Sequence, residues 1–174
     1  MADRTGVVTF KGGGLTLEGE QLSVGQPAPE FTIRTGLAPD SEYTLATDAG
    51  KVRLLSVVPS LDTPVCSLQT QRFNEEAAAL GDKVVIVTVS MDLPPAQERW
   101  CQANSVANLK TASDYFDHSF GLATGLRIKE LGLLARSVVI LDGDGVVRYL
   151  QIVPEVTDEP DYDDAIAAVK AIAG

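Results

Sequence analysis

Hydrophobic residues in this chain fall into two kinds of segment. Short apolar runs rich in β-branched residues are typical of strands, and the clearest cover 54–58, 84–89, 137–141 and 146–153. Longer segments with helix-forming residues or apolar positions on one side predict helices over 67–80, 94–104 and 161–173. In 67–80, for example, Phe73, Ala77 and Leu80 share one helical face. Strands and helices therefore alternate, and the chain ends with a hairpin and a helix.

Weaker patterns complete the picture. Segments 7–10 and 15–17 flank the turn KGGG at 11–14, which predicts an N-terminal β-hairpin within about residues 5–20. Short strands are expected at 31–34 and 43–45, and a loop with a short helix near 119–122 is expected over 112–127. This order predicts an α/β protein with a thioredoxin-like fold: a central mixed β-sheet flanked by helices, with the β-hairpin as an N-terminal extension.

Length, charge and composition argue against several classes of function. The length of 174 residues fits one domain, 1–174, and the net charge of −10 argues against nucleic acid and anionic membrane partners. No apolar stretch is long enough for a membrane helix, and residues 1–5 do not begin a signal peptide. Two cysteines do not make a disulfide scaffold, so a cytoplasmic location is expected, where a disulfide is usually transient and catalytic.

Cys66 is the strongest candidate for a catalytic residue. It follows a predicted strand and opens a predicted helix, with Thr63 at the N-cap and Pro64 at the first helical position. Free backbone N–H groups and the helix dipole favour a thiolate there, so Cys66 is a candidate nucleophile. The alternative is that Cys66 is a buried cysteine acting as a small hydrophobic residue. No Lys or Arg lies within five positions of it, so an activating cation would have to come from elsewhere in the chain.

Other residues favour ordinary structural roles. His118, the only histidine, has no second His or Cys nearby for a metal site, and nothing in the sequence completes a cysteine-protease pattern around it. Asp142 and Asp144 lack the spacing of an EF-hand, and the acidic run at 158–164 favours a helix N-terminus. The glycines at 12–14 precede no Lys-Ser/Thr and form a turn, not a phosphate cradle.

Several blocks together resemble the peroxiredoxins and, within them, the bacterial thiol peroxidase subfamily. They are 59–66 (PSLDTPVC), 90–94 (SMDLP), 99–101 (RWC), 133–136 (LLAR) and 153–162 (VPEVTDEPDY). The resemblance covers essentially the whole chain. Any single block is a weak signal, but their combination in this order is specific.

The resemblance implies a role for five residues. Cys66 matches the peroxidatic cysteine, which attacks peroxide as a thiolate, and Thr63 matches the threonine that orients sulfur and substrate. Pro59 matches the proline that shields the site. Arg136 matches the distant arginine of the family, although a surface ion pair is the alternative for it. Cys101 matches the resolving cysteine, which forms an intramolecular disulfide with Cys66.

The implied function is an antioxidant thiol peroxidase that reduces hydrogen peroxide and organic hydroperoxides, with thioredoxin as electron donor, a homodimeric assembly and no metal, haem or flavin cofactor. Because Cys66 and Cys101 are predicted on separate helices, both segments are expected to unwind locally before the disulfide forms. A peroxide sensor using the same cysteine pair without sustained turnover is the alternative. A thiol–disulfide oxidoreductase is disfavoured because the chain has no Cys-x-x-Cys, and a non-catalytic scaffold would react slowly with peroxide.

Overall fold

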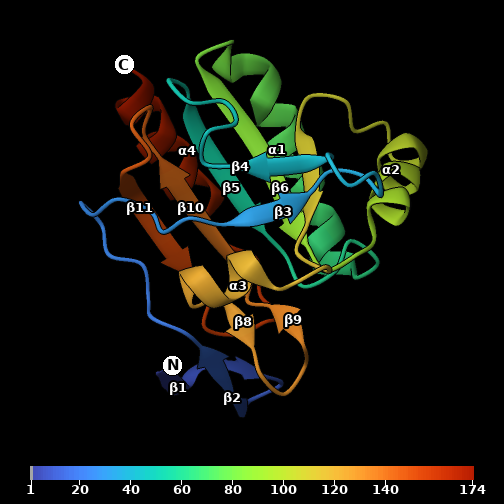
Figure 1. Cartoon of the computed structure of the whole chain (residues 1–174), viewed down its shortest axis with the longest axis vertical. Coiled ribbons are helices and arrows are strands. Elements are labelled where there is room, and N and C mark those ends of the chain that lie inside the picture. The colour runs from blue at the N-terminus through green and yellow to red at the C-terminus, as the bar shows by residue number, and fades with distance from the viewer. Residues whose placement is uncertain (1) are drawn as a thin grey trace.

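A seven-stranded mixed sheet runs through the centre of the molecule (Figure 1). The computed structural model describes residues 2–174. The strands of this sheet are β3 (Thr32–Arg34), β4 (Glu42–Thr44), β5 (Val52–Val57), β6 (Val84–Ser90), β7 (Lys110–Ser113), β10 (Ser137–Leu141) and β11 (Val147–Ile152). Their spatial order is β11-β10-β5-β6-β7-β3-β4, in which β5, β6 and β7 are parallel and every other neighbouring pair is antiparallel.

Helices cover both faces of the sheet. They are α1 (Pro64–Leu80), α2 (Pro94–Ala103), α3 (Ser119–Thr124) and α4 (Tyr162–Ala173). α1 and α4 pack over one face, where Phe73 and Val169 join alternate strand residues such as Leu54 in one apolar cluster. The residues between them, such as Leu55, point to the opposite face and join a second cluster with Phe120 of α3. Because both faces of β5 are covered, every residue of that strand is buried.

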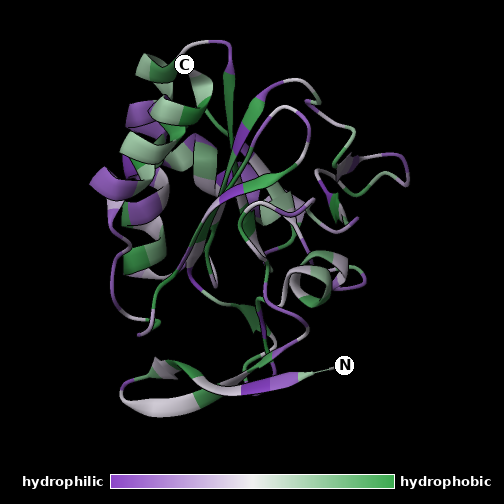
Figure 2. Cartoon of the chain, turned by 90° about the vertical axis from the view of Figure 1, so that its left-hand side faces the viewer, coloured by the Kyte–Doolittle hydropathy of each residue, from purple (hydrophilic) through white to green (hydrophobic). Residues whose placement is uncertain are grey.

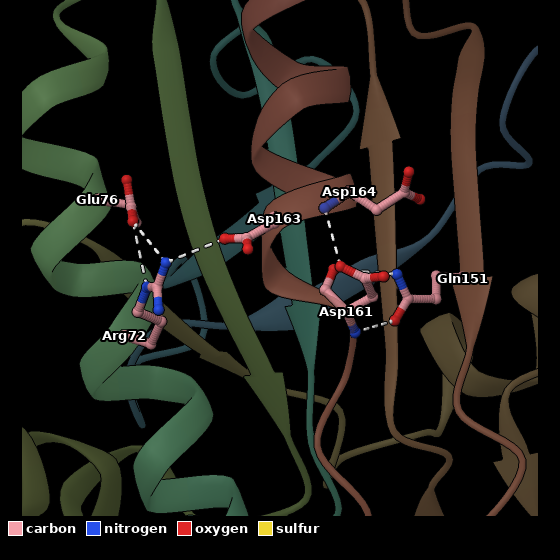
Figure 3. Close-up of polar contacts among 6 residues, drawn as sticks. All are labelled: Arg72, Glu76, Gln151, Asp161, Asp163 and Asp164. Atoms are coloured by element: carbon pink, nitrogen blue, oxygen red, sulfur yellow. Dashed lines mark hydrogen bonds and ion pairs between the residues drawn. The ribbon is translucent and has the colours of Figure 1, made fainter.

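Polar contacts hold α4 in place beside α1 and β11 (Figure 3). Arg72 of α1 reaches Asp163 of α4 at 3.4 Å, and Gln151 of β11 accepts a hydrogen bond from the Asp161 N–H at 2.7 Å. The Asp161 carboxylate in turn accepts from the Asp164 N–H at 2.9 Å and so caps the helix. The expectation that the acidic run supports a helix N-terminus is confirmed.

The N-terminal hairpin is present and belongs to a second, smaller sheet, set apart from the main one (Figure 2). Its strands lie in the order β1 (Asp3–Phe10), β2 (Gly13–Glu18), β8 (Arg127–Ile128) and β9 (Leu133–Leu134). Backbone hydrogen bonds join Thr9 of β1 to the segment after β11: its N–H donates to the Pro154 carbonyl at 2.7 Å and its carbonyl accepts from the Val156 N–H at 2.9 Å. The hairpin is thereby attached to the edge of the molecule where β5 ends and β10 begins, close to Cys66 and Arg136.

The expectation for 112–127 is wrong at both ends. The segment was expected to be a loop with one short helix, but β7 extends to Ser113 and β8 begins at Arg127, while α3 confirms the helix. β7 has the sequence KTAS, which lacks the apolar run of a buried strand and is held by pairing with β6. After β7, the buried Asp114 carboxylate accepts the backbone N–H groups of Phe120 and Gly121 at the start of α3, and burial raises its pKa to about 6.

No helix within residues 2–174 has the length and apolar character needed to cross a membrane.

Candidate active site

Cys66 lies at the turn between β5 and α1. The turn begins where the Val58 N–H bonds the Val89 carbonyl at 3.0 Å, and α1 begins at Pro64. Cys66 is the third residue of the helix and its side chain is fully buried. Its backbone N–H therefore belongs to the first helical turn, whose donors have no partner within the helix and favour a negative charge.

Thr63 occupies the N-cap position as expected, but its side chain acts differently. No side-chain capping hydrogen bond forms, and the hydroxyl donates to the Ser60 carbonyl at 3.0 Å instead. The side chain is exposed on the wall of the cavity beside the site. The hydroxyl thus holds the turn between β5 and α1, and the residue lines the space that a substrate could enter.

Arg136 supplies the cation that the sequence around Cys66 lacks. It lies just before β10, is only 2% exposed, and its Nη2 lies 3.3 Å from the Cys66 Sγ, 70 positions away in the chain. Its Nη1 donates to Gln69 Oε1 at 3.1 Å and its Nε to the Val156 carbonyl at 2.9 Å. These two contacts fix the guanidinium plane, so that one nitrogen is directed at sulfur. Arg136 is a buried guanidinium and not a surface ion pair.

Gln69, a residue of α1, holds the Arg136 guanidinium by a hydrogen bond. The Gln69 side chain is fully buried, accepts from Arg136 and donates from Nε2 to Ser56 Oγ at 2.9 Å. Gln69 was not among the residues predicted from the sequence, although its position three residues after Cys66 places both side chains on one face of α1.

An apolar cavity of about 300 Å³ opens beside this cluster. Its lining includes Arg136, Thr63 and the buried Pro59, and also side chains that come from distant parts of the chain. The remaining lining residues are Phe10, Pro64, Val65, Leu131, Leu133, Val156 and Thr157. Phe10 belongs to the N-terminal hairpin, so the hairpin contributes one wall of the cavity. Sequence reasoning could not identify these lining residues because no local pattern connects them.

Cys101 lies apart from this cavity. It is half-buried in α2 and lines a different hollow of about 550 Å³, and both cysteines are free thiols. Burial raises the pKa of the Cys101 thiol, partly offset by a hydrogen bond with Thr111. Its neighbour Trp100, not Cys101 itself, packs against the small apolar cluster that contains Cys66. The structure thus brings Cys66, Thr63, Pro59 and Arg136 together and leaves Cys101 outside.

Metal ligation finds no support in the described part of the chain. No group of three or more His, Cys, Asp or Glu side chains within residues 2–174 could hold a metal ion. His118 adopts a left-handed backbone conformation, with φ of 58°, at the start of α3.

Comparisons with known proteins identify the family of the chain. Residues 23–166 match the family model for redoxins. The thiol peroxidase of Bacillus subtilis is 53% identical over 95% of this chain and 97% of its own length, and that of Streptococcus pneumoniae is 50% identical over 95% of this chain and 100% of its own. A crystal structure of a peroxiredoxin-like protein from Aquifex aeolicus is 40% identical, covers 97% of each chain and has a TM-score of 0.86. A thiol peroxidase structure from Chromobacterium violaceum, 17% identical over 94% of this chain and 95% of that one with a TM-score of 0.80, supports the fold alone.

Proposed function

The chain belongs to the redoxin family and, within it, to the thiol peroxidases, and from this premise we propose that Cys66 is the residue that attacks peroxide. The chain is a thiol-dependent peroxidase. Arg136, Thr63 and Pro59 complete the site around the sulfur. The observation that carries the proposal is the 3.3 Å contact between the Arg136 guanidinium and the Cys66 sulfur in a buried helix N-terminus.

In the proposed first step the Cys66 thiolate attacks one oxygen of the hydroperoxide. The S–O bond forms as the O–O bond breaks, the departing oxygen takes a proton and leaves as water or an alcohol, and the cysteine becomes a sulfenic acid. Arg136 stabilises both the thiolate and the negative charge that grows on the departing oxygen. The Thr63 hydroxyl, at the cavity wall, orients the peroxide.

In the proposed second step Cys101 acts as the resolving residue. Its thiol attacks the sulfur of the Cys66 sulfenic acid, the S–S bond forms as the S–O bond breaks, and the oxygen leaves as water with the Cys101 proton. Cysteine Cα atoms must come within about 7 Å for this bond, so α2 and the start of α1 loosen first. The separate hollows beside the two thiols support this requirement.

Hydrogen peroxide and organic hydroperoxides are the proposed substrates. Hydrogen peroxide needs only the polar groups at sulfur, whereas the apolar cavity walls, such as Leu131 and Leu133, accommodate the carbon chain of an organic hydroperoxide. The thiol chemistry itself requires no metal, haem or flavin. The hairpin and the main sheet act as one domain over 1–174, since β2 pairs with β8 and Phe10 reaches the cavity.

We further propose thioredoxin as the electron donor, a homodimer as the assembly and the cytoplasm as the location. Two electrons from a dithiol donor reduce the Cys66–Cys101 disulfide and restore both thiols. A reducing compartment keeps such a pair available for repeated cycles. Antioxidant defence and cell redox homeostasis follow from continuous turnover.

The test follows NADPH consumption with thioredoxin, thioredoxin reductase and cumene hydroperoxide. We expect sustained turnover in the wild type, none in Cys66→Ser, and one rapid oxidation without cycling in Cys101→Ser. Turnover that persists in Cys66→Ser would refute the assignment of the nucleophile, and full cycling in Cys101→Ser would refute that of the resolving residue. A single oxidation per wild-type molecule despite several tested dithiol donors would favour the peroxide sensor.

A further inference from the structure

We infer that Asp92 is a positioning residue that couples the two cysteine segments and sets when they separate. The inference rests on the proposed function, since it concerns the disulfide between Cys66 and Cys101. Asp92 lies two residues before Pro94, the first residue of α2, and is half-buried. Its hydrogen bonds go to neither sulfur, and it does not line the cavity beside Cys66.

Asp92 reaches the turn that carries Cys66. Because β5 and β6 are parallel neighbours, the segments that follow them leave the same edge of the sheet. There the Asp92 carboxylate accepts the Ser60 hydroxyl on Oδ1 at 2.7 Å and the Leu61 N–H on Oδ2 at 2.8 Å. Hydrogen bonds to an ionised carboxylate are about twice as strong as neutral ones. The Asp92 carboxylate thus fixes the first half of the turn between β5 and α1.

The same carboxylate is connected to the helix that carries Cys101. Asp92 Oδ2 also accepts the Ser90 hydroxyl at 2.7 Å, and the Ser90 oxygen accepts the Gln97 side-chain amide at 2.9 Å. Gln97 is a fully buried residue of α2 whose amide also donates to the Ala112 carbonyl of β7 at 2.8 Å. A continuous chain of hydrogen bonds therefore runs from β7 through α2 to the turn beside Cys66.

The packing of Trp100 is a second connection between α2 and the turn that carries Cys66. Trp100, one helical turn after Gln97, packs against Val58, Leu61 and Cys66. Cys101 is directed to the other hollow, near Thr111. Bringing the sulfurs together requires Trp100 to leave the cluster, and Leu61 cannot move away while its N–H is bonded to Asp92. Release of the Asp92 contacts is therefore a step between the sulfenic acid and the disulfide.

This role predicts opposite effects on two rates. Removing the carboxylate loosens the turn, so peroxide attack, which needs the ordered site, becomes slower. Disulfide formation, which needs the loosened state, becomes faster. The sulfenic acid then survives for less time, so a second hydroperoxide oxidises less of it to sulfinic acid. Loss of one charge-assisted bond corresponds to roughly a tenfold change in such an equilibrium.

The experiment mixes reduced full-length protein with cumene hydroperoxide in a stopped-flow instrument and records Trp100, the single tryptophan of the sequence. The Cys101→Ser variant identifies the first phase, since it forms no intramolecular disulfide. For Asp92→Ala we expect a several-fold slower first phase, an about tenfold faster second phase and less sulfinic acid by mass spectrometry. Asp92→Asn, which keeps one acceptor oxygen, should fall between this variant and the wild type.

Two further variants keep the test decisive. Asp82→Asn changes an exposed carboxylate at the opposite end of β6 and should behave as the wild type. Ser60→Ala removes one donor to Asp92 and should accelerate the second phase even if Asp92→Ala does not fold. Unchanged phases, or both phases slowed by the same factor in Asp92→Asn and Ser60→Ala, would overturn the coupling role alone. Absence of any Cys66–Cys101 disulfide in the wild type would overturn the proposed function and this inference with it.

Discussion

At the scale of the residue, the buried Arg136 places a cation in contact with the Cys66 sulfur. The partners of its three guanidinium nitrogens are a backbone carbonyl, an amide oxygen and the Cys66 sulfur. A buried cation is costly unless an opposite charge accompanies it. Of these three partners, the sulfur is the proposed reacting atom, so Arg136 places a buried positive charge directly beside it.

Replacing Arg136 by methionine tests this argument. We expect peroxide attack to slow by about a hundredfold or more, the usual cost of removing one donor that stabilises a developing negative charge. The measurement is the rate of Cys66 oxidation by cumene hydroperoxide between pH 5 and 9.

Arg53→Met is the matched control. Arg53 is equally buried, at 1% exposure, but it donates to the carbonyls of Leu45 and Asp142, away from the cysteines. An Arg53→Met variant that slows oxidation as much as Arg136→Met does would indicate a general loss of structure and contradict the specific role.

Local sequence patterns predict the positions of the residues next to Cys66, but they do not predict which distant residues contact it. Thr63 and Pro64 mark a helix start by local rules, so the position of Cys66 in the first turn could be predicted. The contact with Arg136 spans 70 positions and depends on how β10 pairs with β5, which no local pattern encodes. Arg136 was named only because of a family resemblance. Asp92 lies in the sequence block 90–94, but the sequence indicated no role for it because its hydrogen-bond partners Ser60 and Leu61 lie on another segment.

At the scale of the element, Glu155 ties the hairpin to the site. Its carboxylate accepts hydrogen bonds from the Gly12 N–H at 2.9 Å and the Thr157 N–H at 3.0 Å, and also from the Thr9 hydroxyl at 3.1 Å. These bonds, chiefly the two from backbone N–H groups, lower the pKa of Glu155 from its usual 4.5 to about 2. The neighbouring Val156 then presents its carbonyl to Arg136.

The lowered pKa of Glu155 predicts a pH-dependent contribution to stability. Because the folded-state pKa lies below the unfolded one, the contribution is present above about pH 4.5 and is lost as the pH falls toward about 2. We expect Glu155→Gln to lower the free energy of unfolding at pH 7, with a difference from wild type that shrinks between pH 5 and 3. Urea unfolding at each pH measures it. A difference that stays constant over this range would show that ionisation of Glu155 contributes nothing.

Elements were predictable where apolar pattern and turn chemistry agreed. The run VVIVTV at 84–89 and the turn DGDG at 142–145 mark β6 and the β10–β11 hairpin, and both predictions are confirmed. β7 could not be predicted because its four residues are polar or small, and the strand exists through its ladder with β6. The two-residue strands β8 and β9 are likewise shorter than any periodic signal.

At the scale of the whole molecule, one cluster of exposed apolar side chains is the surface that we propose for the homodimer. Leu37 and Phe116 are each 62% exposed and border one shallow hollow with Pro39 and Tyr115. The Arg34 guanidinium lies 4.5 Å from the centre of the Phe116 ring and holds it in this exposed position. Exposed apolar clusters of this kind are typical of protein interfaces.

Phe116→Ser is therefore expected to weaken the dimer by tenfold or more in its dissociation constant, the effect typical of losing an aromatic anchor. Sedimentation equilibrium over a range of protein concentrations measures it. Val24→Ser is the control, since Val24 is 60% exposed but lies outside this hollow. Equal dissociation constants for wild type and Phe116→Ser would place the interface elsewhere, and a wild type that is monomeric at every concentration would exclude the dimer.

The burial of Arg136 also bears on the redox potential of the cysteine pair. In the proposed cycle, a thiolate at Cys66 would balance the buried guanidinium, whereas a disulfide sulfur is neutral and leaves that charge without an opposite one. The uncompensated cation destabilises the oxidised form relative to the reduced form. A pair whose reduced form is stabilised has a higher reduction potential and accepts electrons readily. In the proposed cycle, the contact that activates Cys66 toward peroxide thus also favours reduction of the disulfide.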